Sequence, residues 1–155
     1  MSQAAKGEER QSSPASGTLA VSASYEGSGS IAQSRALART FLADVQSAHG
    51  LAVSERAMER VQLVVSELTT NAYKYAPGSY TLALAVREGV VEVTVGDTEP
   101  ALPVAWAADA GRVGQHGLEI VMAVCHSFEV HRESVGKRVK ATIVLADATQ
   151  GRARQ

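Results

Sequence analysis

The segment SELTTNAYKY, residues 66–75, carries three polar side chains at helical spacing: Glu67, Asn71 and Lys74. Residues three and four apart lie on the same side of a helix, so these three form a row along one border of the apolar stripe. A carboxylate one turn before a carboxamide can orient a water and complete the ligand shell of Mg²⁺, which prefers oxygen ligands. A lysine one turn further along can meet a phosphate as a point charge. Because charged helix borders are common, a solvated border is the alternative interpretation.

Two later stretches carry groups that suit the same chemistry. Asp97 follows Gly96 at the end of an apolar strand pattern, where a carboxylate can accept a hydrogen bond from a ligand amine in an apolar pocket. The segment GRVGQHGLEIVMAV, residues 111–124, places three glycines ahead of an apolar helix, and backbone N–H groups in such a turn can approach an anion. The alternatives are an Asx-turn for the aspartate and a plain flexible loop for the glycines.

Hydrophobic periodicity predicts the elements that must position these groups. The period is helical early in the chain and changes to two in the later segments,. Ser30 and Ser54 are suitable helix N-caps,. The predicted elements are an edge strand over 18–25, helices over 30–50 and 54–75, a hairpin of strands 80–86 and 90–95 joined at 87–89, a loop over roughly 97–113, a short helix from about Gly117, and a second hairpin over 128–145 turning at Val135-Gly136.

The order of these elements predicts the fold class. Helices come early, strands come mostly late, and the strands are joined by hairpins, which is typical of an α+β protein. We therefore expect a two-layer sandwich, in which a mostly antiparallel mixed sheet has its helices packed on one face.

Composition limits the classes of function. The hydrophobic fraction of 45% and charged fraction of 20% are those of an ordinary globular domain,. The formal net charge of -1 gives no electrostatic support to direct nucleic-acid binding or to an anionic membrane surface,. The chain has one cysteine, no apolar run long enough to span a membrane and no signal-like N-terminus, so we expect a cytoplasmic protein,.

The two ends of the chain contain few large apolar residues that could be buried in a core. Residues 1–17 and 148–155 are rich in small, polar and charged residues, and we expect both to be disordered tails,. The folded domain is then expected to span residues 18–147.

Three motifs in order resemble the GHKL ATPase superfamily, whose members have the Bergerat ATP-binding fold. ELTTNAYKYA looks like the N box, VGDTEPALP like the first glycine box and GQHGLEIV like the second. The resemblance covers roughly residues 20–146. Among its subgroups the chain looks most similar to the bacterial anti-sigma-factor serine/threonine kinases.

The resemblance implies a role for each matching residue. Glu67 would be the general base or water-orienting carboxylate, Asn71 the protein ligand of Mg²⁺, and Asp97 the acceptor for the adenine amino group of ATP. Lys74 would contact a phosphate. The lid around the phosphates would contain Gly114, Gln115, His116 and Gly117, with Leu118 at the start of the following helix.

Two positions depart from the family pattern. Glu99 stands where the first glycine box usually has a glycine, and Lys137 follows Gly136 where the closing strand often has a threonine near the adenine. Both departures bear on nucleotide affinity and catalysis more than on the fold.

The resemblance implies an ATP-binding regulatory protein that phosphorylates a serine of an antagonist protein, sequesters a sigma factor, or does both. It also implies a homodimer with a lid over residues 98–113 that ATP orders. The alternative is a sequestering module without catalysis, for which nucleotide is a ligand only or is no longer bound.

Overall fold

The computed structural model describes residues 9–12, 18–27, 30–75, 79–97, 113–133 and 136–146, which form one six-stranded sheet and three helices. The strands are β1 Glu9–Ser12, β2 Thr18–Glu26, β3 Ser79–Arg87, β4 Val90–Asp97, β5 Ser127–Arg132 and β6 Lys137–Val144. The helices are α2 Ser30–His49, α3 Glu55–Tyr75 and α5 Val113–Val124.

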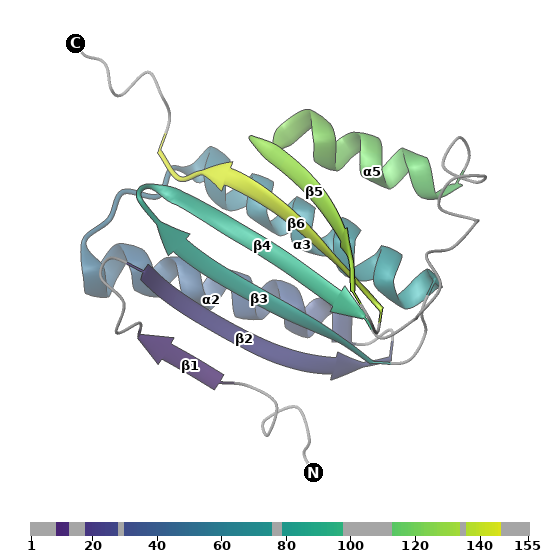
Figure 1. Cartoon of the computed structure of the whole chain (residues 1–155). Coiled ribbons are helices and arrows are strands. Elements are labelled where there is room, and N and C mark those ends of the chain that lie inside the picture. The colour runs from purple at the N-terminus through teal and green to yellow at the C-terminus, as the bar shows by residue number, and fades with distance from the viewer. Residues whose placement is uncertain are drawn as a thin grey trace.

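The sheet has the order β1-β2-β3-β4-β6-β5, and every pairing within the described residues is antiparallel. Helix α2 contacts β2 and β3, α3 contacts β3, β4 and β6, and α5 packs on α3. The helices lie on one side of the sheet and the other face is uncovered in the described part (Figure 1). The predicted α+β two-layer architecture is confirmed. The sheet was expected to be mostly antiparallel, and within the described residues β6 also pairs with β4 in the antiparallel sense.

The core lies between the sheet and the two helices α2 and α3. Alternate residues of β3 and β4 are buried, since successive side chains of a strand point to opposite faces,. On α3 the apolar stripe supplies the opposing surface, and the fully buried residues there recur at the helical period: Ala57, Val61, Val64, Val65 and Leu68,. Because inward and outward side chains alternate along each strand, the same alternation determines whether the last residue of a strand faces the helices.

Local signals at two boundaries are confirmed. The backbone N–H of Ala57 donates to Ser54 Oγ at 2.9 Å, so Ser54 caps α3 as predicted,. Glu88 and Gly89 both have positive φ, 55° and 78°, as a two-residue hairpin turn requires,. Ser30, the other expected cap, instead donates its hydroxyl to the carbonyl of Gly27 and is hydrogen-bonded by the Tyr80 hydroxyl, each at 2.6 Å.

Two predicted boundaries differ from the structure. Residues 9–12 form β1 within the segment expected to be disordered, and their pairing with β2 makes β2 an interior strand instead of an edge strand. Helix α5 begins at Val113, before the expected start near Gly117. The expected turn residue Val135 and nearly all of the expected lid, residues 98–112, lie outside the described residues.

Among the helices of the described part, none combines the length and apolarity needed to cross a lipid bilayer.

Candidate functional site

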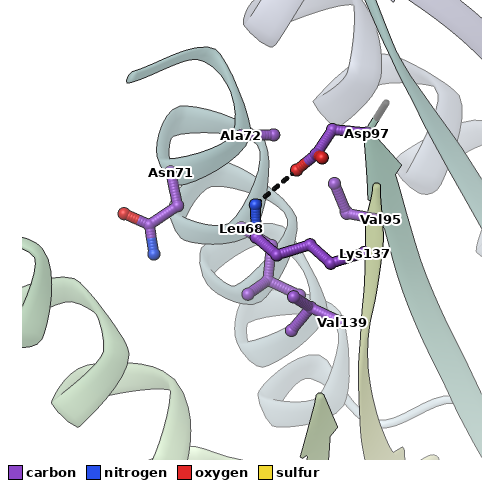
Figure 2. Close-up of a pocket in the computed structure, with 7 residues that line it drawn as sticks. All are labelled: Leu68, Asn71, Ala72, Val95, Asp97, Lys137 and Val139. Atoms are coloured by element: carbon purple, nitrogen blue, oxygen red, sulfur yellow. Dashed lines mark hydrogen bonds and ion pairs between the residues drawn. The ribbon is translucent and has the colours of Figure 1, made fainter. Parts of the chain in front are cut away.

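A cavity lies between α3 and the ends of two neighbouring strands (Figure 2). Strand β4 ends at Asp97 and β6 begins at Lys137, and these two residues are paired in the antiparallel register. The described residues around the cavity come from all three elements: Leu68, Asn71, Ala72, Val95, Asp97, Lys137 and Val139. Most of this lining is apolar, so its polar groups are few and their positions decide what the cavity can bind.

Strand alternation directs Asp97 and Lys137 toward the helices. On β4 the buried positions are Val91, Val93, Val95 and Asp97, and on β6 they begin with Lys137 and Val139. The two charged residues therefore occupy positions that the pleat assigns to the core face. A carboxylate and an ammonium group are thus held side by side at the rim of the core.

Asp97 and Lys137 form a buried ion pair. Lys137 Nζ donates to Asp97 Oδ2 at 2.6 Å, and the side chains are 4% and 3% exposed respectively (Figure 2). Removing two charges from water is costly, so such a pair persists only when each charge compensates the other. Asp97, which was expected to accept a hydrogen bond from a ligand amine, therefore already accepts one from the amine of Lys137.

Asn71 lies at a second part of the same cavity. It is buried on α3, and its Nδ2 makes no hydrogen bond to any residue that the structure describes. Figure 2 shows its carboxamide directed away from the Asp97–Lys137 pair. A buried amide with an unmade hydrogen bond is energetically unfavourable, so this group is suited to a polar ligand that enters the cavity.

Glu67 and Lys74 do not belong to the described lining of the cavity. Glu67 is half-buried and lies one turn before Asn71 on α3, whereas Lys74 is exposed near the end of the helix. The structure thus brings Asn71 and Asp97 to one cavity, whereas Glu67 and Lys74 lie on the same helix outside its described lining.

The glycine-rich segment differs from the expectation. Residues 114–117 belong to the first turns of α5 and not to a loop ahead of it, and Leu118 is buried inside the helix instead of starting it. The N-terminal turn of a helix still presents backbone N–H groups that lack intrahelical acceptors. Anion binding by this segment stays a prediction, and it would now depend on the first turn of α5 instead of on a loop.

Sequence reasoning noted Lys137 as a departure from the family pattern but did not foresee its bond to Asp97. The signal was available in principle, because both residues continue the inward parity of their strands at the same end of the sheet. Within the described residues, no cluster of three or more His, Cys, Asp or Glu side chains could hold a metal ion.

Comparison with known protein families matches residues 29–143 to the histidine kinase-like ATPase domain. This match covers most of the chain, and the chain belongs to this family, a branch of the GHKL ATPases. Membership supports an ATP-binding regulatory role. Closeness to the anti-sigma-factor kinases within the superfamily is not established by this match.

A similar solved structure is the histidine kinase domain of the blue-light activated histidine kinase from Erythrobacter litoralis EL346, with 22% sequence identity and a TM-score of 0.47. The aligned region covers 72% of this chain and 60% of that chain. A search of curated proteins finds no match to the sequence.

Proposed function

We propose that this protein is an ATP-binding regulator that acts as an anti-sigma-factor-like serine/threonine kinase. It would transfer the γ-phosphoryl group of ATP to a serine of an antagonist protein and sequester a sigma factor, working as a homodimer. The observation that carries the nucleotide site is the cavity at the ends of β4 and β6. Asn71 and Asp97, which the sequence assigns to the metal and to the base, line this one cavity.

The residues present suit Mg-ATP at one end of the cavity. The Asn71 carboxamide is buried and its Nδ2 makes no hydrogen bond among the described residues, and its oxygen is a ligand type that Mg²⁺ accepts alongside waters and phosphates. When bound, Mg²⁺ would neutralise charge on the phosphates during transfer. The N-terminal turn of α5 would supply backbone N–H groups to the phosphate oxygens.

Glu67 is the proposed general base. Its half-buried position one turn before Asn71 allows it to orient the acceptor hydroxyl and take the hydroxyl proton,. The serine oxygen then bonds to the γ-phosphorus while the bond from that phosphorus to the bridging oxygen of ADP breaks. Most of the rate enhancement would come from positioning and charge neutralisation, as in other phosphoryl transfers.

A second candidate function is a non-catalytic module that sequesters its partner, with nucleotide as a weak ligand or none. The observation that favours it is the Lys137–Asp97 bond, because it engages the carboxylate expected to recognise adenine. The two candidates share the fold and differ in whether a phosphoryl group is transferred.

Transfer of a labelled phosphoryl group separates them. The protein is incubated with γ-labelled ATP at millimolar concentration, Mg²⁺ and candidate antagonist proteins, and label on the antagonist is followed. Glu67→Ala should abolish transfer while keeping ADP affinity. Glu59→Ala is the matched control, since it removes an exposed glutamate from the same helix. Nucleotide binding without transfer in the wild type would refute the kinase and leave the sequestering module.

A further inference from the structure

The base end of the cavity already holds an amine. A carboxylate in an apolar pocket recognises a ligand by accepting a hydrogen bond from an amino group, and Lys137 Nζ makes such a bond to Asp97 Oδ2 at 2.6 Å. We infer that Lys137 is an internal ligand of the nucleobase site, which a purine amino group must displace from Asp97 before it can bind. This inference rests on the proposed nucleotide site. It adds that Lys137 determines the affinity of this site for a nucleotide.

The space around the ion pair supports this inference. The cavity has a volume of about 10 Å³, roughly enough for one water. Pockets that hold organic ligands measure about 300–1,000 Å³. With Lys137 in this position, the described lining leaves no room for a purine ring, so base entry requires the lysine side chain to move.

Stability alone is a poor explanation for a lysine at this position. The desolvation of two charges largely offsets their attraction, so a buried ion pair gains little over apolar residues of similar size. The neighbouring inward residues, Val95 and Val139, show that the strands accept apolar side chains next to both positions. A buried charge pair at the rim of a cavity is therefore better explained by control of what enters it.

The two ends of the cavity differ. Asp97 is engaged by Lys137, whereas the buried Nδ2 of Asn71 makes no hydrogen bond among the described residues and its carboxamide points away from the pair (Figure 2). Among the described residues, the ion pair therefore obstructs the base end of the cavity. Binding of a nucleotide would require displacement of Lys137 at that end.

The test is the affinity for ADP and for Mg-ATP, measured by isothermal calorimetry on wild type and two variants. Lys137→Thr removes the ammonium and its bulk, while the threonine hydroxyl retains one donor for Asp97. Lys140→Thr is the matched control, because it makes the same substitution on the same strand at a position of opposite parity,. We expect Lys137→Thr to bind roughly tenfold more tightly or better, and Lys140→Thr to bind like the wild type.

The outcomes distinguish this inference from the proposed function. Equal or weaker binding by a folded Lys137→Thr protein, with measurable binding by wild type, would overturn the role of Lys137 alone. An absence of binding at millimolar nucleotide in all three proteins would overturn both the inference and the nucleotide site.

A measurement on the wild type keeps the inference testable if Lys137→Thr fails to fold. Reductive methylation followed by mass spectrometry reports how accessible each lysine is. Lys137, whose side chain is 4% exposed, should react faster at saturating ADP, whereas the rate for Lys140 should not change. Unchanged protection of Lys137 in the ADP-bound protein would contradict its displacement.

Discussion

Replacing only one residue of the Asp97–Lys137 pair should lower the free energy of unfolding far more than replacing both residues together. Both side chains are at least 96% buried, being 3% and 4% exposed, and the charged atoms are 2.6 Å apart. Lys137→Met removes the cation that bonds this buried carboxylate, and breaking a buried pair from one side costs about 3–5 kcal/mol. Asp97→Val combined with Lys137→Met replaces both charges with apolar groups and should return the free energy of unfolding to within about 1 kcal/mol of wild type, or above it.

Urea unfolding followed by circular dichroism measures these differences in free energy, and thermal unfolding measures the corresponding shift in melting temperature. A chain of 155 residues shifts its melting temperature by about 2–4 °C per kcal/mol, so the single variant should melt roughly 6–20 °C below wild type. The cost is a large part of the about 5–15 kcal/mol that holds a typical domain together. A loss below about 1 kcal/mol for Lys137→Met would show that the pair is solvated, and the reasoning about an occupied base site would then fail.

Three further outcomes are expected from other parts of the molecule. Asn71→Ala should lose the Mg²⁺-dependent part of ATP affinity in calorimetry with little loss of stability, since its Nδ2 makes no hydrogen bond among the described residues; an unfolded variant would contradict this. Ser54→Ala should lower the free energy of unfolding by about 1 kcal/mol, because it removes the 2.9 Å cap of α3, and an unchanged urea midpoint would refute the cap. Burial raises the pKa of the Cys125 thiol, so its alkylation by iodoacetamide should be slow at neutral pH compared with free cysteine and accelerate as pH rises; fast modification at neutral pH would contradict the burial.

The elements with strong periodic signals could be predicted from the sequence. Helix α3 was predicted within a residue of its start, because its apolar stripe is continuous and Ser54 marks its beginning. The β3–β4 hairpin followed from alternation and from a turn, Glu88-Gly89, that tolerates positive φ,. In these segments local propensity and tertiary packing agree, and the local signal was therefore sufficient.

Strand β1, which was not predicted, and the first turn of α5, which was predicted as a loop, lack such agreement. Strand β1, ERQS, has no apolar alternation, and it forms by adding to the edge that β2 offers. Helix α5 begins within a segment containing Gly114 and Gly117, and glycine has low intrinsic helix propensity,. Local reasoning reads both segments as irregular, and only their neighbours in the fold make them regular.

For the candidate site too, local sequence signals predicted some features, whereas others depend on neighbours in the fold. Spacing and position made Asn71 and Asp97 candidate site residues, and the resemblance to the GHKL ATPases implied a role for each. Whether those groups are available depends on what the register places opposite them, and β6 places Lys137 opposite Asp97. A family motif therefore predicts which side chains face the cavity, while the pairing of strands distant in sequence determines which of them can bind a ligand. In the described part of this protein, Asn71 on the helix has an amide nitrogen that makes no hydrogen bond, whereas Asp97 on the sheet accepts a hydrogen bond from Lys137.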